Sequence, residues 1–171
     1  MKLTKEEKEQ LEQLYQSLLN HELVKRMIDI PMHRGSNCYY HSFKVTKLAI
    51  KRGLRHKNVN LHTILLAGIF HDYYLYDWRK DKTKRKHHGS HHPYLAAKLA
   101  KEDFSIDESV QKVIKSHMWP INIKEFPRTK EARILTLADK AIATKEALTS
   151  KRYKSKRKEK YENYIKTLFD Y

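Results

Sequence analysis

The sequence predicts an all-α fold in a single domain of about six to seven helices. Apolar residues, mostly Leu, Ile and Ala, recur at helical spacing along much of the chain. Glycine and proline number only four each, which argues against sandwiches, barrels and sheets with glycine-rich turns. A chain of 171 residues can bury one core but is too short for two full-sized domains. We expect an N-terminal helix packed on the domain at 1–29, the domain core at 30–148 and a basic segment at 149–171.

The first three helices are predicted from signals at their ends. A threonine suited to capping precedes Lys5–Asn20, whose leucines form an apolar stripe. Residues 31–40 contain one Pro and one Gly and predict a loop. The next helix should begin at His41 and end at Gly53, because glycine is common at helix C-termini. Asn60 can cap a third helix that is apolar nearly all round, which predicts a central position in the fold.

Two further helices are predicted in the middle of the chain. The strongly charged stretch 79–86 is expected to be a loop. Pro93–Phe104 should form the fourth helix, because proline is favoured at the first helical position. Ser105 and Glu108 have the spacing of a capping box, which predicts a fifth helix that Pro120 terminates.

The last part of the chain combines one long helix with a strongly basic run. A sixth helix is predicted over 130–148 from its apolar spacing. The residues expected to face inward from this helix are Ile134, Leu137, Ala138 and Ala141. Residues 151–160 hold seven Lys or Arg in ten positions, and 161–171 can form one more docked helix.

The net charge and the cysteine count limit the partners and the compartment. Thirty-six Lys and Arg against 20 Asp and Glu give +16, which is compatible with nucleic acid, nucleotides and acidic membrane surfaces. Cys38 is the one cysteine, so an intramolecular disulfide is excluded and a reducing compartment is the natural setting. The longest apolar run is too short to span a bilayer, and the first residues lack the apolar run of a signal peptide. We therefore expect a cytoplasmic protein without a membrane partner.

Histidine and aspartate recur in five segments on different predicted helices. His71 and Asp72 end the most apolar helix, where a carboxylate is costly unless it is paired or bound to a cation. The other four segments contribute His41, His92 in the cluster HHGSHHP, His117 and Asp139. Imidazole and carboxylate without thiolate suit catalytic iron, manganese, cobalt, nickel or zinc rather than a structural zinc site. Taken singly, each histidine is also compatible with a hydrogen-bonded core residue or a solvated surface, and Asp139 with an ion pair to Lys140.

The order of these segments resembles that of a known superfamily. The first histidine lies in YYHSFKVTKLA, the His-Asp pair in LLAGIFHDYYLYDW and the last aspartate in ILTLADKAIA, with further histidines in HPYLAAKLA and VIKSHMWP. Over about residues 30–148 the chain resembles the HD superfamily of metal-dependent phosphohydrolases. The segments HDYYLYDW, HGxxHP and HMWP together look like one bacterial branch of it. The resemblance implies an HD-type helical bundle in which a metal-activated hydroxide hydrolyses a phosphomonoester or phosphodiester.

The resemblance also implies a set of metal ligands. One ion would be bound by His41, His71, Asp72 and Asp139, and a second by His92 and His117. Asp72 would bridge the two ions and would therefore be the central catalytic residue. One or two divalent ions are expected, iron or manganese first, with cobalt, nickel or zinc as alternatives. A bridging carboxylate would hold two ions about 3.5–4 Å apart, where they can activate a water and bind phosphoryl oxygens.

Several residues near these segments are candidates for contacting the substrate. His33 is the candidate acid for the leaving group or donor to a phosphate, with Arg34 beside it. Lys140 and Arg79 could add positive charge, and His88 could contact a metal ligand or the substrate, although the two cations are also compatible with a solvated surface. The aromatic residues that flank the ligand segments are Tyr73, Tyr74, Tyr76, Trp78 and Trp119. Any of these rings that lines the pocket would favour a nucleotide, and packing in the core is the alternative.

The favoured hypothesis is a hydrolase that acts on a nucleotide. Within the enzymes, the alternative is a phosphodiesterase acting on a cyclic or dinucleoside polyphosphate signal. From another class, the alternative is a non-enzymatic nucleic-acid-binding protein on an HD scaffold. In that case the basic runs 79–86 and 151–160 would contact phosphates, and binding would fall steeply with salt.

Overall fold

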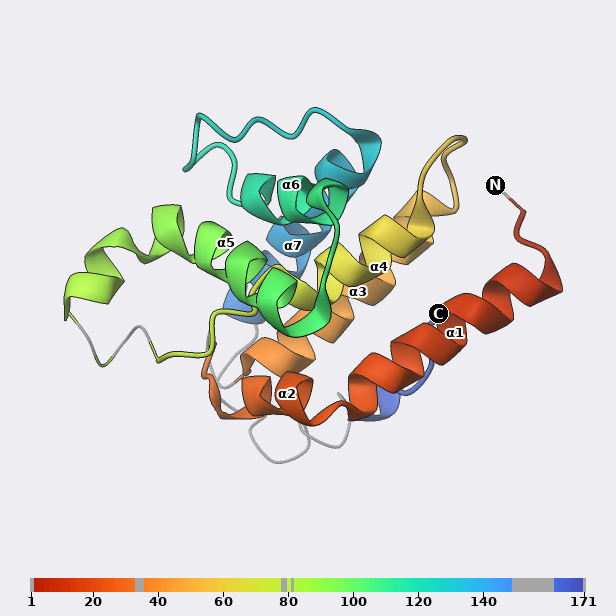
Figure 1. Ribbon diagram of the computed structural model, residues 1–171, viewed down its shortest axis with the longest axis horizontal. Coiled ribbons are helices and arrows are strands. Elements are labelled where there is room, and N and C mark those ends of the chain that lie inside the picture. Colours follow the sequence, from red (N-terminus) through yellow and green to blue (C-terminus); the bar gives the residue numbers. More distant parts are fainter. Residues whose placement is uncertain (1, 33–35, 78–79, 81, 149–161, 171) are drawn as a thin grey trace.

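The fold is all-α, as predicted. A computed structural model describes residues 2–32, 36–77, 80, 82–148 and 162–170, and within these ranges the chain forms seven α-helices, one 3-10 helix and no strand (Figure 1). The elements are α1 (Lys5–Asn20), α2 (Glu22–Lys25), η1 (Arg26–Asp29), α3 (Cys38–Gly53), α4 (Leu61–Phe70), α5 (Lys82–Phe104), α6 (Glu108–Ser116) and α7 (Lys130–Leu148). None of the described helices is both long enough and apolar enough to traverse a lipid bilayer.

Helix α4 lies at the centre of the molecule, between α3, α6 and α7 (Figure 1). Asn60 caps it as predicted, because the Asn60 side chain accepts a hydrogen bond from the backbone N–H of Thr63 at 3.0 Å. Its contact with α3 is very close at Gly68, where a Cβ atom would lie only 2.6 Å from Oγ1 and 3.0 Å from Cα of Thr46. A glycine therefore lets the two backbones approach. The approach brings the first turn of α3 beside the end of α4.

The N-terminal helix and the C-terminal residues pack together on the side of the molecule opposite α5 (Figure 1). Thr4 caps α1 as the sequence predicted, and Glu7 completes a capping box with it. The hydroxyl of Tyr15 on α1 donates to the carbonyl of Ile165 at 2.6 Å, and Lys47 on α3 donates to the carbonyls of Tyr164 and Asp170 at 2.8 and 2.7 Å. Residues 162–165 form one helical turn. The basic run 151–160 lies outside the described residues.

The start of α3 differs from the prediction. The helix begins at Cys38 rather than at His41, because the side chain of Asn37 accepts a hydrogen bond from the N–H of Tyr40 at 2.9 Å and so caps the helix. The predicted loop 31–40 therefore extends too far, because residues 38–40 already belong to α3. Gly53 is the last residue of α3, as expected, but its role is packing. A Cβ atom there would lie 2.7 Å from Cδ2 of Leu61 on α4.

Helix α5 begins much earlier than the sequence suggested. Residues from Lys82 onward are helical, although the charges of 79–86 predicted a loop, and Pro93 lies inside the helix rather than at its first position. Proline removes one backbone hydrogen bond. Packing compensates, because the ring of Tyr74 contacts His88 and His92 with centroids 4.9 and 5.5 Å apart. These two histidines therefore share a face of a continuous helix.

The cap of α6 was predicted at the wrong residue. Asp107, not Ser105, is the N-cap, since its carboxylate accepts from the N–H of Val110 at 2.9 Å. Ser105, which directly follows α5, has a φ of 52°, in the left-handed region. The helix ends at Ser116, ahead of Pro120, so His117 is its C-cap residue.

Helix α7 spans Lys130–Leu148 as predicted, but one of its expected core residues is wrong. Ile134 and Ala138 are buried, whereas Leu137 is 60% exposed and Ala141 is half-buried. The additional apolar positions that α7 buries are Ala132, Leu135 and Ile142. Because α7 contacts α3, α4 and α6, it buries residues on more than the single apolar face that the sequence pattern predicted.

Candidate metal centre

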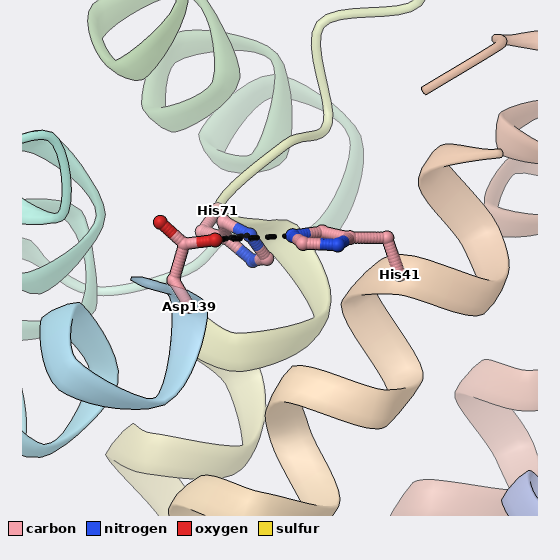
Figure 2. A group of neighbouring side chains, drawn as sticks. All are labelled: His41, His71 and Asp139. Atoms are coloured by element: carbon pink, nitrogen blue, oxygen red, sulfur yellow. Dashed lines mark hydrogen bonds and ion pairs between the residues drawn. The ribbon is translucent and has the colours of Figure 1, made fainter. Parts of the chain in front are cut away.

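Three of the predicted ligands meet at one point. His41 comes from the first turn of α3, His71 from the residue that caps the C-terminus of α4, and Asp139 from the middle of α7. All three are buried, and their side chains point toward one another (Figure 2). Oδ1 of Asp139 lies 3.0 Å from Nε2 of His41 and 3.8 Å from Nε2 of His71. We call these residues the first triad, and their geometry suits one metal ion.

A second group of three lies next to the first. Asp72 follows α4, His92 lies on α5 and His117 caps α6, and all three are buried. Oδ1 of Asp72 lies 3.2 Å from Nε2 of His92 and 3.8 Å from Nε2 of His117. We call these residues the second triad, and their ligand atoms also lie close enough to share an ion.

The carboxylate of Asp72 connects the two triads. Its Oδ1 atom faces the second triad, and its Oδ2 atom lies 3.4 Å from Nε2 of His71 and 3.8 Å from Nε2 of His41. One carboxylate therefore presents one oxygen to each group, which is the arrangement of a bridging ligand.

Backbone carbonyls fix the orientation of three of the imidazoles. Nδ1 of His71 donates to the carbonyl of Gly68 at 2.8 Å, and Nδ1 of His117 donates to that of Ile114 at 2.7 Å. Nδ1 of His92 donates in the same way to the preceding turn of α5, at 2.7 Å. A carbonyl can only accept, so each Nδ1 carries the proton and each Nε2 directs a lone pair at the centre in the neutral ring. These are the hydrogen bonds that metal-ligating histidines usually make.

Two features of the imidazoles indicate a cation at the centre. Nε2 of His92 and Nε2 of His117 lie 2.9 Å apart. Burial lowers the pKa of His117 to about 3, with the neighbouring His92 and His71 acting in the same direction, so this ring is neutral near pH 7. Two facing lone pairs repel, so a proton or a metal ion has to lie between them. Among the described residues, Nε2 of His71 has no hydrogen-bond partner although it is buried, which is the state expected of a metal ligand.

Both aspartates at the centre are negatively charged. Burial raises the pKa of Asp139, but the hydrogen bond from His41 and the nearby imidazoles outweigh burial and lower this pKa to about 2. Burial likewise opposes ionisation of Asp72, and the surrounding His71, His92 and His117 hold its pKa well below the ordinary value. Two buried carboxylates in contact with imidazoles are costly without cations and become favourable ligands when cations bind. The residues present therefore fit divalent metal ions.

A cavity of about 300 Å³ opens beside the two triads. Beyond the ligands, it is lined by Met32, His88, Met118, Ile121, Lys140 and Ala143. His88 stacks on the ring of His92, with centroids 4.4 Å apart, and its Nδ1 lies 2.9 Å from the hydroxyl of Tyr76. The amine of Lys140 donates to the backbone carbonyls of His117, at 3.4 Å, and of Trp119. Lys140 therefore also holds the segment that carries His117 against α7.

Other predicted substrate contacts lie away from this cavity or cannot be placed. Tyr73 is buried, and its hydroxyl donates to Asp103 at 2.7 Å on the side of Phe104. Tyr74 is buried between α3 and α5, and Trp119 packs on Phe126 rather than lining the cavity. The remaining candidates, His33, Arg34, Trp78 and Arg79, lie outside the described residues. Of the two alternatives for these rings, packing in the core is therefore the one that holds for Tyr73 and Tyr74.

Comparison with known proteins agrees with this geometry. The family model of the HD domain matches residues 38–144, which is more than half of the chain. The chain belongs to the HD domain family. HD domains are typically metal-dependent phosphohydrolases, which agrees with the two triads of imidazole and carboxylate ligands. Searches among curated proteins and among solved structures found no match. The matched range lies within 30–148, and the boundaries of that predicted core stay a prediction.

The HD domain contains one buried carboxylate that the sequence analysis missed. Glu146 lies on α7, two helical turns after Asp139 and on the same face. Its Oε2 atom accepts from Nδ1 of His41 at 2.9 Å, and its Oε1 atom accepts from Ser36 at 3.1 Å and from Lys44. Glu146 thus orients His41 as the carbonyls orient the other histidines. The spacing from Asp139 was the available signal, but glutamate near the end of a charged helix usually faces solvent.

We expect Glu146→Gln to weaken metal binding at the first triad by about 10–100-fold, because it removes the charge that orients and polarises His41. Binding at the second triad should change much less. Titration of the metal-free protein with Mn(II) against a chromophoric chelator measures both affinities. Glu102→Gln, at an exposed position of α5, is the matched control. Equal affinities in wild type and Glu146→Gln, with the helical signal intact, would show that Glu146 is only structural.

Proposed function

We propose that this HD domain hydrolyses a phosphomonoester or phosphodiester of a nucleotide at a dinuclear metal centre. The observation that carries the proposal is the bridging position of Asp72, which presents one carboxylate oxygen to each triad. Two adjacent sites of this kind suit phosphoryl transfer, in which both the attacking and the leaving oxygen need stabilisation.

The roles of the ligands follow from their positions. His41, His71 and Asp139 would hold one ion, His92 and His117 the other, and Asp72 would contact both. Divalent ions bound there would lower the pKa of a water to give the attacking hydroxide and would neutralise the phosphoryl oxygens. Imidazole and carboxylate ligands favour iron or manganese, with cobalt, nickel or zinc as alternatives. The carbonyls that fix the Nδ1 protons keep the ligands in place without reorganisation during the reaction.

His88 is the described residue best placed to act on the leaving group. It lines the cavity directly beside His92, and its ring is held by the Tyr76 hydroxyl. An imidazole can donate a proton to a leaving oxygen near neutral pH. The earlier candidate for this role, His33, stays a proposal because it lies outside the described residues.

The size and lining of the cavity support a single nucleotide over a dinucleotide. A volume of about 300 Å³ is at the small end of ligand pockets, which disfavours a dinucleoside polyphosphate. Met32, Met118 and Ile121 form an apolar wall beyond the metal ligands. Such a wall packs better against the flat face of a base than against the hydroxyls of a sugar phosphate.

A substrate panel tests this proposal. The metal-free protein is reconstituted anaerobically with Fe(II) or Mn(II), and phosphate or alcohol release is measured from nucleoside monophosphates, a cyclic nucleotide, a dinucleoside polyphosphate, a sugar phosphate and two nitrophenyl esters. We expect a nucleotide to be the best substrate and a chelator to abolish its turnover. Failure to cleave any ester while two ions are bound would reject the hydrolase. Preference for the dinucleotide would reject the argument from cavity size.

A further inference from the structure

The segment between α6 and α7 exposes several large apolar side chains. Within residues 118–128, here called the apolar loop, Ile121 is 67% exposed, Ile123 79% and Phe126 45%. Trp119 packs edge-on against Phe126, with ring centroids 5.4 Å apart, and is itself half-buried. Single exposed apolar residues are ordinary, but three within six positions form a patch of the kind that marks an interaction surface.

Specific hydrogen bonds hold the apolar loop in this exposed arrangement. The hydroxyl of Tyr94 on α5 donates to Glu125 at 2.8 Å and accepts from Asn122 at 3.3 Å. On the other side, Arg133 on α7 donates to the carbonyl of Pro127 at 3.1 Å. The loop is therefore tied to α5 and α7 at several points, and its apolar side chains face outward although the backbone is anchored.

The apolar loop also borders the cavity beside the metal centre. Ile121 lines that cavity, and a Cβ atom built on Gly89 of α5 would lie 3.5 Å from its side chain. Whatever covers Ile123 and Phe126 would therefore lie near the mouth of the cavity.

The charge of the molecule decides which partner fits this loop. Lys124, Arg128 and Lys130 lie in or next to the loop and are exposed, and Glu125 already accepts from Tyr94. With a net charge of +16, a second copy of the chain would be repelled. A nucleic acid would suit the cations and could stack on Phe126, but it would gain little from Ile121 and Ile123, which are the most exposed side chains of the loop. Apolar side chains among cations suit the boundary between the headgroups and acyl chains of an anionic bilayer.

We propose that the apolar loop docks this protein onto an anionic lipid bilayer, with Ile123 and Phe126 entering the interface and the neighbouring cations contacting the headgroups. The cavity mouth then faces the headgroup layer. This contact needs no membrane-spanning helix, and it differs from the expectation of no membrane partner, because the sequence did not reveal which apolar residues of the loop face outward. It is also independent of the proposed reaction.

Vesicle co-sedimentation of the full chain tests the proposal. We expect binding to vesicles of equal parts phosphatidylglycerol and phosphatidylcholine, and much weaker binding to phosphatidylcholine alone. The double variant Ile123→Ser/Phe126→Ser should weaken binding to the anionic vesicles at least about tenfold, since it removes the two apolar side chains that would enter the bilayer interface. Leu148→Ser is the matched control, because Leu148 is 78% exposed but lies at the far end of α7. Metal content, which the double variant should retain, shows that the fold is intact.

Four results would overturn the proposal. Binding of the double variant equal to that of wild type would mean that charge alone adsorbs the protein. Absence of binding to anionic vesicles at low salt would exclude the bilayer. A self-associated wild type that the double variant converts to monomer in sedimentation equilibrium, or RNA affinity lost in the double variant, would assign the loop to a second copy or to nucleic acid instead.

Discussion

Asp72→Ala is expected to remove both metal ions and to lower phosphoester turnover by at least about a thousandfold. The reason is the position of its carboxylate, which presents Oδ1 to the second triad and Oδ2 to the first. In the variant, the first triad would keep Asp139 as its only carboxylate. The second triad would then have two histidines and no anionic ligand. Loss of the shared oxygen atoms therefore weakens both sites together.

Elemental analysis of protein prepared without chelator or affinity tag measures this effect directly. Wild type should contain about two divalent ions per chain, and Asp72→Ala close to none, with its helical circular dichroism retained. Asp103→Ala is the control, because Asp103 is an exposed carboxylate that accepts from Tyr73, away from the centre. A wild type with a single ion would indicate a mononuclear enzyme, with His92 and His117 serving the substrate. No ion even after anaerobic reconstitution would argue against the hydrolase.

The histidines and aspartates that the sequence singled out lie close together in the structure, and their role as metal ligands stays a prediction. His71 and Asp72 stand out as polar residues at the end of the most apolar helix, and the structure places both in buried positions at the end of α4. Their burial is costly without a cation, so the anomaly itself pointed to a metal. The helix N-caps Thr4 and Asn60 were also predicted from the sequence, since a side-chain cap depends on residues only a few positions apart.

Predictions that depended on packing between distant segments were less accurate. Pro93 is a local signal for a helix start, but contacts of Tyr74 with His88 and His92 extend α5 by several turns before it. Exposure of Leu137 could not be predicted either, because which side of α7 is buried depends on the placement of α3, α4 and α6. Tertiary contacts outweigh local propensity in both cases.

Features inside the metal site that depend on packing between helices were also not predicted from the sequence. Glu146 lies two turns from Asp139, and only the packing of α3 on α7 reveals that it orients His41. The sequence left open whether the tyrosines near the His-Asp pair line the cavity or pack in the core. In the structure Tyr73 and Tyr74 pack in the core, and the cavity wall is formed in part by Met32 and Met118. Residue types indicated the metal chemistry, but the surroundings of the metal ligands required the three-dimensional arrangement.

His92→Ala should separate the two sites, since it removes a ligand from the second triad only. His92 contacts Asp72 at 3.2 Å and His117 at 2.9 Å, whereas the first triad keeps all of its ligands. We expect the variant to hold one ion instead of two. Turnover should fall by on the order of a hundredfold or more, because one of the groups that stabilise charge on the phosphoryl oxygens is lost. His91→Ala is a close control, because His91 is the adjacent residue of α5 and is exposed.

The number of ions retained by His92→Ala distinguishes two independent sites from one extended site. If each triad binds its own ion, the remaining ion should stay bound with an affinity close to that of wild type, because His41, His71 and Asp139 do not contact His92. Release of both ions by this one change would show that the six side chains act as a single site. Retention of both ions would mean that His92 is no ligand, and that the short distance between His92 and His117 reflects a shared proton rather than a metal.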